Sequence, residues 1–405
     1  MEVLGKPETL EEQVQKQIDL GRKVAEGFIT RNPRLRFIDF AGLGRHGGAL
    51  ILEERGILDQ IIRRFIIKYS LGDYTGDPYS NADMDLRNEH RWLRLLQGCE
   101  HIVQLVPFAD CSLNLPGISN GERTYEAAME NARREDEARG TPGATSVRRY
   151  PTFALEYLQY GELRDFVDRL KAKGELVPNR ILWRIWLCLV RQCVAMAFPI
   201  DDPDNPNTGL PWQITREIIR PDEEYFSLTQ NSAHLENWLW GDQQASHDPD
   251  LIDFGRGQLE LPQNWPEHGL DNENEIASRV NLFNAASVMT EICLPLESRR
   301  FLRFTRDSHL YEYDEDGQDL NLWTQAPESL MSAATMDLEL RHILVRCMAE
   351  RIARVPSLRE ALERAERAVA NRGPYDDPHL CRLMNVDEDD DYILEFFQRF
   401  VYNPE

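Results

Sequence analysis

Three glycines near the N-terminus have the spacing at which a backbone can pass close to phosphate groups. Gly42, Gly44 and Gly47 form the pattern Gly-x-Gly-x-x-Gly, which occurs in dinucleotide sites and also in ordinary tight turns. A dinucleotide site needs a helix directly after the third glycine. Here Ala49–Leu52 is apolar and strand-like, so we predict a glycine-rich turn between two strands.

A lysine and a glutamate farther along the chain carry opposite charges at positions where apolar residues are expected. Lys68 ends the apolar run Phe65–Ile67, and an ammonium group beside buried aliphatic side chains needs a carboxylate or phosphate partner. Glu89 shares a helical face with Leu86 and Leu93, because residues three and four apart lie on one side of a helix. We predict either an ion pair of about 3 to 4 Å between Lys68 and Glu89 or a helix that is swung out and carries Glu89 away from the lysine. For Lys68 alone, the alternative is a surface side chain with a buried stem.

Further polar residues follow predicted strands. Asn237 opens the sequence Asn-x-Leu-x-Gly-Asp, and Asp253 is the carboxylate of the sequence Leu-Ile-Asp-Phe-Gly. Glu156 and Leu158 lie at the end of a strand-like segment that precedes Gly161 and a predicted helix. Each pattern is common by itself, so the order of the patterns along the chain carries the information.

In this order, the patterns resemble the motifs of the eukaryotic protein kinase family, over about residues 35–370. The resemblance implies a site for ATP in which the glycine hairpin covers the phosphates. It implies that Lys68, paired with Glu89, holds the α- and β-phosphates. It also implies that the segment with Glu156 and Leu158 pairs with adenine.

The same resemblance assigns Mg²⁺ to Asn237 and Asp253, but the catalytic loop departs from the family's pattern. That loop reads His-Arg-Asp-x-x-x-x-Asn in kinases, whereas residues 230–237 here read Gln-Asn-Ser-Ala-His-Leu-Glu-Asn. Ser232 takes the place of the aspartate that orients the substrate hydroxyl and accepts its proton. A neutral hydroxyl does both poorly. We therefore expect phosphotransfer to be impaired or absent.

A second departure concerns the segment after Asp253. Residues 256–277 contain no serine, threonine or tyrosine, and Asn231 replaces the arginine that receives a phosphorylated loop in many kinases. The sequence Trp-Pro-Glu ending at Glu267 resembles the Ala-Pro-Glu that closes this loop, which makes the loop very short. By the same resemblance we expect a buried ion pair between Glu267 and Arg354.

The elements that must position these residues are predicted from apolar spacing and from helix-capping and turn residues. The N-terminal strands indicate an antiparallel sheet. Asp83 or Asp85 is the expected N-cap of the second helix, and Gly98 its expected end. The predicted elements are a charged helix over Thr9–Phe28, strands over Leu35–Phe40, Ala49–Leu52 and Arg64–Tyr69, and a helix over Asp83–Gln97.

The middle of the chain changes character. After a strand predicted over His101–Pro107, the stretch Phe108–Tyr150, which contains the highly charged Glu126–Arg139, is typical of a solvated insertion, and order resumes at Thr152–Leu155. The remainder is predicted to be mainly helical. Its most apolar segments, Ile181–Ile200 and Val280–Ile292, are interpreted as buried helices, since charged residues within the first argue against a membrane span.

Composition narrows the classes of partner. The chain has 405 residues, of which 42% are apolar, and a net charge of −23. This amount of apolar surface suffices for a large core, whereas the charge argues against nucleic acid and anionic membranes as partners. The seven cysteines include no Cys-x-x-Cys pair, so we expect reduced thiols, no disulfide and no zinc, in a cytoplasmic or nuclear protein.

We expect an α+β fold with two lobes, an antiparallel sheet plus one helix in the N-lobe and a mainly helical C-lobe. The expected function is that of a pseudokinase that binds ATP and Mg²⁺ and serves as an interaction module for a protein partner. The alternatives are a weakly active Ser/Thr protein kinase, a small-molecule phosphotransferase, and a structural protein that binds no nucleotide. The expected divisions are an N-terminal helical extension (1–34), the N-lobe (35–158) with its insertion (108–150), the C-lobe (159–373) and an acidic tail (374–405).

Overall fold

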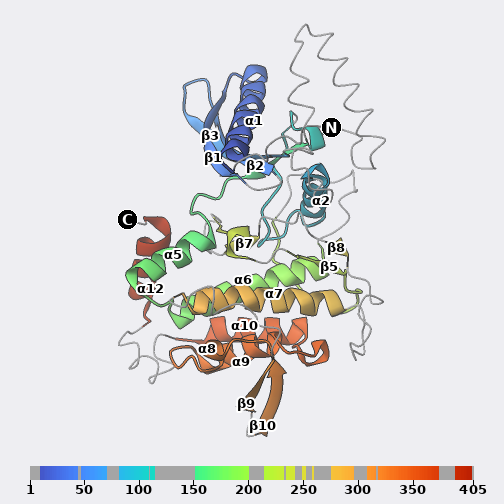
Figure 1. The fold of residues 1–405 in the computed structure, drawn as a ribbon, viewed down its shortest axis with the longest axis vertical. Coiled ribbons are helices and arrows are strands. Elements are labelled where there is room, and N and C mark those ends of the chain that lie inside the picture. The colour runs from blue at the N-terminus through green and yellow to red at the C-terminus, as the bar shows by residue number, and fades with distance from the viewer. Residues whose placement is uncertain are drawn as a thin grey trace, which may run out of the picture. The chain divides into compact units, whose positions relative to one another are not determined.

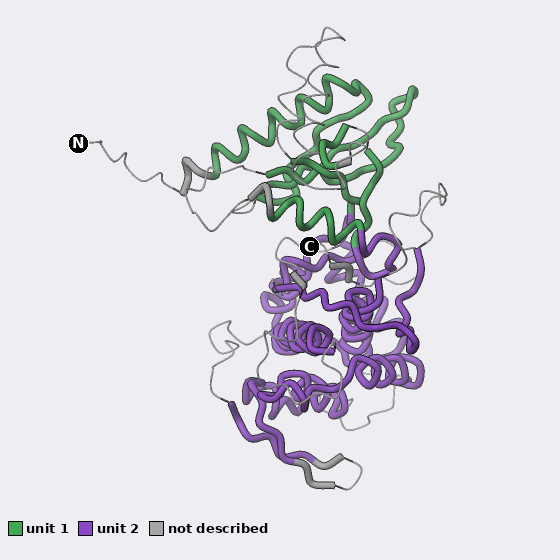
Figure 2. Tube along the Cα trace, turned by 90° about the vertical axis from the view of Figure 1, so that its right-hand side faces the viewer, with its two compact units in different colours: residues 1–94, 103–157 green, residues 95–102, 158–405 purple. Residues whose placement is uncertain are grey.

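The computed structural model gives an α+β protein, as expected, whose described residues fall into two compact units (Figure 2). Unit 1 comprises Met1–Arg94 and Val103–Tyr157, and unit 2 comprises Leu95–Ile102 and Leu158–Glu405. The described residues are 10–43, 47–70, 82–108, 110–114, 151–199, 214–231, 234–241, 249–251, 258–259, 275–295, 308–315, 318–373 and 388–403.

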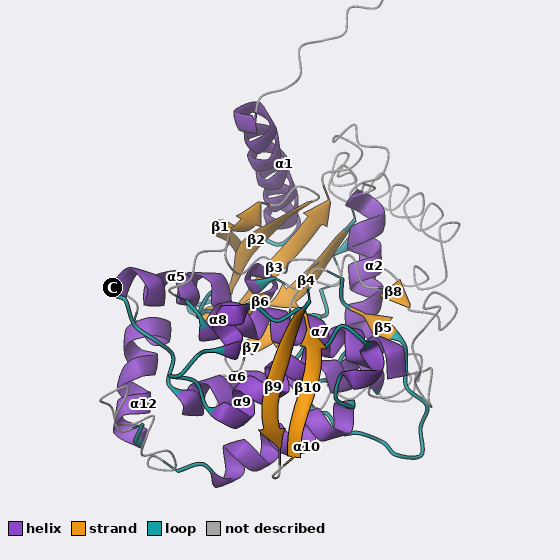
Figure 3. Ribbon diagram, turned by 60° about the horizontal axis from the view of Figure 1, so that its bottom comes forward, coloured by secondary structure: helices purple, strands orange, loops and turns teal. Residues whose placement is uncertain are grey.

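Unit 1 is built on a four-stranded antiparallel sheet with the strand order β1-β2-β3-β4 (Figure 3). This confirms the predicted antiparallel N-terminal sheet. The strands β1 to β3 extend beyond the apolar runs that predicted them, because backbone pairing continues through polar residues. The strands are β1 (Leu35–Leu43), β2 (Gly47–Arg55), β3 (Ile61–Ser70) and β4 (Thr152–Glu156).

Helix α1 (Leu10–Arg31) packs into the core of unit 1. Val24 and Phe28 belong to the same buried cluster as Leu50 and Phe65 of the sheet. Because Val24 and Phe28 are four residues apart, they lie on one side of the helix. The segment expected as an N-terminal extension is therefore part of the hydrophobic core of this unit.

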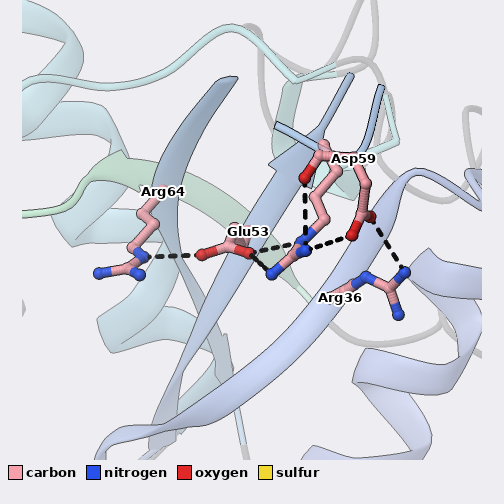
Figure 4. Close-up of polar contacts among 5 residues, drawn as sticks. Arg36, Glu53, Asp59 and Arg64 are labelled. Carbon is pink, nitrogen blue, oxygen red and sulfur yellow. Dashed lines mark hydrogen bonds and ion pairs between the residues drawn. The ribbon is translucent and has the colours of Figure 1, made fainter. Parts of the chain in front are cut away.

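The turn between β2 and β3 is fixed by alternating charges (Figure 4). Asp59 has a φ of 62°, in the left-handed region that non-glycine residues seldom occupy. Its carboxylate lies 2.8 Å from Arg55 and 3.3 Å from Arg36. Glu53, with 1% of its side chain exposed, pairs in turn with Arg55 and Arg64 at 2.7 and 3.0 Å. These ion pairs oppose the backbone strain at Asp59.

Helix α2 (Ala82–Leu95) differs from its prediction at both ends. Because it begins at Ala82, Asp83 and Asp85 lie in its first turn and are not the N-cap. Acidic residues in a first turn still favour the helix dipole. The helix ends before Gln97, and Gly98, with a φ of 91°, lies in the turn that follows.

The strand predicted over His101–Pro107 is reduced to isolated bridges at Ile102 and Leu105, and Leu105 pairs antiparallel with Leu155. The start of this segment is bonded elsewhere, since the His101 backbone N–H donates to the Glu217 carboxylate across 2.8 Å. An N–H that bonds to a side chain cannot also extend a strand ladder.

The described residues at the start of the predicted insertion belong to the core of unit 1. Phe108 and Cys111 are buried in the core of unit 1. The backbone N–H of Thr152 donates to Ser112 Oγ at 2.9 Å, and the N–H of Ser112 donates to Thr152 Oγ1 at 3.1 Å. These bonds join the two described ends of the insertion; residues 115–150 lie outside the described residues.

Unit 2 is mainly helical, as predicted, with α6 in contact with both α7 and α10 (Figure 1). The expected burial of the two most apolar segments is confirmed, and Trp183 and Trp186 of α6 are 1% and 0% exposed. Among the described residues, no helix combines the length and apolar character needed to cross a membrane. The longer helices are α5 (Leu163–Lys173), α6 (Asn179–Ala197), α7 (Ile276–Cys293), α9 (Leu338–Cys347) and α10 (Leu358–Asn371), with the short α8 (Glu328–Met331) before α9.

Two short antiparallel strand pairs bracket the segments that carry the predicted catalytic and metal residues. Strand β5 (Leu228–Thr229) pairs with β8 (Gln258–Leu259). Inside this pair in the sequence, β6 (Trp238–Trp240) pairs with β7 (Pro249–Leu251). The nested pairing brings together chain segments that flank residues 230–237 on one side and residues 252–257 on the other.

A regular hairpin in unit 2 was not predicted. Strand β9 (His309–Glu315) pairs with β10 (Gln318–Thr324) without a register shift (Figure 3). The prediction of mainly helical structure in this region is therefore wrong for these residues.

The described end of the expected acidic tail is folded. Helix α12 (Asp390–Phe397) continues into a π-helical turn over Gln398–Tyr402, and Phe396 and Phe400 are 1% and 2% exposed. Phe396 lies 6.2 Å from the Phe166 ring of α5, measured between ring centroids. Apolar packing therefore attaches these residues to unit 2, despite the acidic residues that precede them.

Candidate functional site

The predicted ion pair between Lys68 and Glu89 is present in unit 1. Lys68 Nζ lies 2.5 Å from Glu89 Oε1, closer than expected, and the side chains are 18% and 6% exposed. Side chains alternate between the two faces of β3. Ile67 and Tyr69 point into the core that also contains residues of α1, so Lys68 lies on the opposite face of the sheet. Glu89 on α2 supplies the carboxylate partner that the ammonium group needs.

The glycine pattern is divided between described and undescribed residues. Gly42 in β1 and Gly47 in β2 are described, whereas Gly44 lies outside the described residues. A Cβ on Gly47 would lie 2.5 Å from the Tyr69 carbonyl oxygen, so the close approach of β2 to β3 requires glycine there. A Cβ on Gly42 would meet no described atom within 4 Å. Packing thus explains Gly47, while Gly42 leaves open space beside the strand.

The segment expected to pair with adenine ends β4. Glu156 is the last residue of that strand, and its backbone N–H donates to the Gln104 carbonyl at 3.0 Å. Its side chain turns to the same neighbour, because Oε1 accepts a hydrogen bond from the Gln104 N–H at 2.7 Å. Leu158 belongs to unit 2 and is 7% exposed. The Glu156 carboxylate therefore has a structural partner in this conformation.

Asn237 lies in unit 2 at the junction of a 3₁₀ turn (Leu235–Asn237) and β6, with 5% of the residue exposed. The next residue, Trp238, pairs with Leu251 and donates its indole N–H to Gln192 of α6 at 2.6 Å. Leu251 precedes Asp253 by two positions, and Asp253 lies outside the described residues. The local fold thus fixes the backbone next to Asn237.

Helix α7 anchors the backbone that leads to Ser232. Asn281 is 3% exposed, accepts a hydrogen bond from the Gln230 N–H at 3.0 Å, and donates to the Leu228 carbonyl at 2.8 Å. Asn284 donates to the Gln230 carbonyl at 2.8 Å. A buried amide can satisfy a donor and an acceptor at once, so one side chain fixes both neighbours of Thr229. Ser232 itself lies outside the described residues.

A charged group that the sequence did not reveal lies beside this segment. Arg164 of α5 pairs with Glu236 at 3.1 Å and with Glu291 of α7 at 2.9 Å. Glu236 also lies 3.2 Å from His234 Nδ1. The hydrogen bond from His234, with a further contribution from Arg164, keeps the pKa of Glu236 well below its usual value against the opposing effect of burial. The arginine is separated from its partners by 72 and 127 positions, so no local sequence pattern connects them.

A second cluster in unit 2 combines metal-ligating residue types. Glu100, His101 and Glu217 place one ligand atom each within 4.8 Å of one another. His101 Nδ1 lies 2.7 Å from Glu217, and a neighbouring pocket of about 410 Å³ is lined partly by Glu100 and His101. Arg216 and Arg191, however, lie 3.4 and 3.8 Å from the Glu100 carboxylate. Two guanidinium groups neutralise that ligand and would repel a divalent cation.

The predicted pair between Glu267 and Arg354 is not supported in its buried form. Arg354 ends the 3₁₀ turn Ile352–Arg354 with an exposed side chain, because the turn lies at the surface. Glu267 lies outside the described residues. A nearby arginine instead contacts this turn from α7, since Arg279 Nη1 donates to the Ile352 carbonyl at 3.4 Å and also to the Val355 carbonyl.

Comparison with known proteins adds no relative. No protein-family model matches this chain, and no curated protein sequence matches it. Of the residues that the kinase resemblance singles out, Gly42, Gly47, Lys68, Glu89 and Glu156 are described in unit 1, and Leu158 and Asn237 are described in unit 2.

Proposed function

We propose that this chain is a kinase-like pseudokinase that binds ATP with Mg²⁺ and acts through a protein partner without transferring phosphate efficiently. The observation that carries the proposal is the ion pair between Lys68 and Glu89. An ammonium group at the end of an apolar strand segment, fixed by a helical carboxylate, is suited to contact nucleotide phosphates. The open space beside Gly42 is compatible with a phosphate group near the glycine turn.

The anchoring of residues 228–230 supports the second half of the proposal. Asn281 binds backbone groups on both sides of Thr229, so the segment that leads to Ser232 has a defined backbone. The nested pairs β5-β8 and β6-β7 flank the segments with Asn237 and Asp253. We infer that Asn237 and Asp253 would bind Mg²⁺, which would neutralise phosphate charge. Ser232 supplies no carboxylate to orient an acceptor hydroxyl.

Titration calorimetry with ATP, in the presence of Mg²⁺ or of a chelator, tests nucleotide binding. We expect binding that requires Mg²⁺ and weakens about tenfold or more in Lys68→Met, a loss of about 1.4 kcal/mol. Asp253→Ala should remove the Mg²⁺ requirement together with most of the affinity. Arg63→Met is the matched control, because it also removes a strand cation of unit 1, one paired with Glu54 at 2.7 Å. Absence of binding by the folded wild-type chain would reject the nucleotide site.

A slow protein kinase is the second candidate, and the assembled Lys68–Glu89 pair favours it. Phosphotransfer depends largely on positioning and charge neutralisation, so loss of one base reduces the rate without necessarily abolishing it. For a pseudokinase, we expect the wild type to transfer the ATP γ-phosphate to a protein substrate no faster than Asp253→Ala does. A wild-type rate above that of Asp253→Ala, unchanged in Ser232→Ala, would favour the kinase. A gain in Ser232→Asp, bounded by about 10² to 10⁴ in rate, would indicate that the remaining site is assembled.

A further inference from the structure

The hairpin of β9 and β10 in unit 2 is fixed at its base and along one face. The Thr324 hydroxyl lies within hydrogen-bond distance of two carbonyl oxygens at the end of α9. Its Oγ1 is 2.9 Å from the Val345 oxygen and 3.0 Å from the Met348 oxygen. On one face, Tyr311 is 7% exposed, and its ring lies 5.8 Å from that of His342 in α9. The Tyr313 ring lies 5.1 Å from the same histidine. The hairpin is therefore supported by α9 and needs no partner to order this face.

The opposite face exposes two large apolar side chains directly across from each other. Leu310 and Trp323 are register partners and are 45% and 55% exposed. Side chains alternate between the faces of a strand, so the next pair on this face is Glu312 with Asn321, and both are exposed. An exposed aromatic residue beside an aliphatic one is typical of the centre of a binding surface.

Beyond this apolar pair, the hairpin is acidic. The sequence of residues 309–324 contains Glu312, Asp314, Glu315, Asp316 and Asp319 and no lysine or arginine. Glu312 is the described carboxylate on the face that carries Leu310 and Trp323.

Among the described strands, β9 pairs with β10 and with no other strand. At the end of β10, the Trp323 carbonyl accepts a hydrogen bond from the Glu350 N–H, just beyond α9, at 2.9 Å. An exposed strand edge can accept an extended segment by backbone hydrogen bonding. Alternate side chains of such a segment would then lie next to Leu310 and Glu312.

We propose that the face with Leu310, Trp323 and Glu312, together with the β9 edge, is a docking surface for an extended segment of a partner protein. The segment would carry apolar and basic side chains at alternate positions, apolar beside Leu310 and Trp323 and basic beside Glu312. This partner chemistry follows from charge complementarity. A second copy of the chain is a poorer occupant, because it carries the same acidic hairpin and a net charge of −23. The proposal does not depend on nucleotide binding.

Fluorescence anisotropy with labelled synthetic peptides tests this surface on the full chain. The probe is a short peptide in which every second residue is leucine or lysine. One control peptide has glutamate in place of lysine, and a second has the probe's composition in scrambled order. We expect the probe to bind and both controls to bind at least about tenfold more weakly. Binding of the probe should weaken as salt is raised.

Substitutions separate this surface from general attraction between a basic peptide and an acidic protein. Trp323→Ala should weaken probe binding about tenfold or more if the indole is a central contact. Glu312→Lys should weaken it more than Glu395→Lys, which makes the same change in net charge at an exposed position of α12. Leu58→Ala is the apolar control, because Leu58 in unit 1 is 87% exposed. Unchanged thermal midpoints would exclude unfolding as the cause of any loss.

Hydrogen exchange supplies an independent readout, since an added strand should protect backbone amides of β9. Protection of β9 by the probe and not by the scrambled peptide would support the proposal. Equal binding of probe and scrambled peptide, or wild-type affinity in Trp323→Ala and Glu312→Lys, would overturn it. Concentration-dependent dimerisation in sedimentation that Trp323→Ala abolishes would overturn the assignment of the occupant, because the surface would then bind a second copy.

Discussion

The carboxylate of Glu89 in α2 lies 2.5 Å from the ammonium group of Lys68 in β3. Lys68 pairs in register with Ala49 on one side and Phe153 on the other, so its backbone has no freedom to move away from α2 without breaking the sheet. The pair therefore couples the position of α2 to the centre of the sheet. Its strength can be measured apart from any nucleotide.

We predict that Glu89→Gln lowers the free energy of unfolding of unit 1 by about 3 kcal/mol, at the low end of the range for breaking a buried ion pair. The low end is expected because 18% of the Lys68 side chain remains exposed and water screens its charge. The double variant Lys68→Met/Glu89→Met should lose less, since it leaves no unpaired charge. Hydrogen exchange of β3 amides as a function of urea reports this unit.

The matched control is Arg63→Met, which removes a partner from the ion pair with Glu54 on neighbouring strands of the same sheet. Arg63 is 41% exposed, so we expect a loss below about 1 kcal/mol. Equal losses in Glu89→Gln and Arg63→Met would show that Lys68 and Glu89 behave as an ordinary surface pair.

The second prediction concerns the amide of Asn281. Asn281→Ala leaves the Gln230 N–H and the Leu228 carbonyl without their present partner inside unit 2. Each unsatisfied buried group costs about 1 to 3 kcal/mol, so the loss should be several kcal/mol. Asn281→Asp keeps an acceptor for Gln230 but directs a carboxylate at the Leu228 carbonyl, and it should also destabilise the unit. Urea unfolding followed by tryptophan fluorescence measures both, because Trp92 is the only tryptophan within the range of unit 1.

Ser287→Ala is the control for Asn281, because Ser287 also lies in α7 and its hydroxyl donates to the Phe283 carbonyl of its own helix. We expect a change within about 0.5 kcal/mol there. A stable Asn281→Ala would mean that residues 228–230 keep their conformation without α7.

The sequence was sufficient for features that have a local signal. A lysine after an apolar run and a glutamate on an apolar helical face predicted the pair of Lys68 and Glu89, and short apolar runs predicted the strands of the sheet that carries the lysine. The β9-β10 hairpin also had such a signal, because every second residue is apolar or aromatic in both segments. These residues are Tyr311 and Tyr313 in β9 and Leu320 and Leu322 in β10. The hairpin was missed because the surrounding segments favoured helices.

Other features had no local signal. Arg164 contacts Glu236 and Glu291, and the Glu388 carboxylate binds the start of α6, across more than 70 positions in every case. Carboxylates are abundant in a chain with 69 acidic residues, so which of them pair with Arg164 or α6 depends on how the helices pack. These contacts are determined by tertiary packing, because local sequence patterns do not specify which distant residues form a pair.

The third prediction concerns a helix cap supplied from the C-terminal segment. Glu388 accepts hydrogen bonds from the backbone N–H groups of Asn179 and Arg180, at 2.7 and 2.8 Å, in the first turn of α6. A carboxylate at this end also interacts favourably with the helix dipole. Glu388→Ala should lower the free energy of unfolding of unit 2 by about 1 to 2 kcal/mol. Glu395→Ala, an exposed change in α12, should have almost no effect, and equal thermal midpoints in the two variants would refute the capping role.

The final prediction uses the pH dependence of stability at Tyr69. This side chain is 0% exposed, and its hydroxyl donates to the Gln17 carbonyl of α1 at 3.1 Å. Burial raises the pKa of Tyr69 to about 12, whereas an unfolded tyrosine titrates near about 10. The folded state therefore favours the neutral phenol. Its contribution to stability is complete below about pH 10 and is lost as the pH rises toward about 12.

Tyr69→Phe removes the hydrogen bond to Gln17 but also removes the ionisation. At neutral pH we expect the variant to be about 1 kcal/mol less stable than the wild type. Ionisation of the unfolded wild-type tyrosine should cancel this difference near about pH 11 and reverse its sign above that. Urea unfolding of both proteins from pH 8 to pH 12 gives the difference directly, and other titrating groups contribute equally to each. A difference that stays constant across this range would show that Tyr69 ionises as readily in the folded chain as in the unfolded one, which its burial against α1 does not allow.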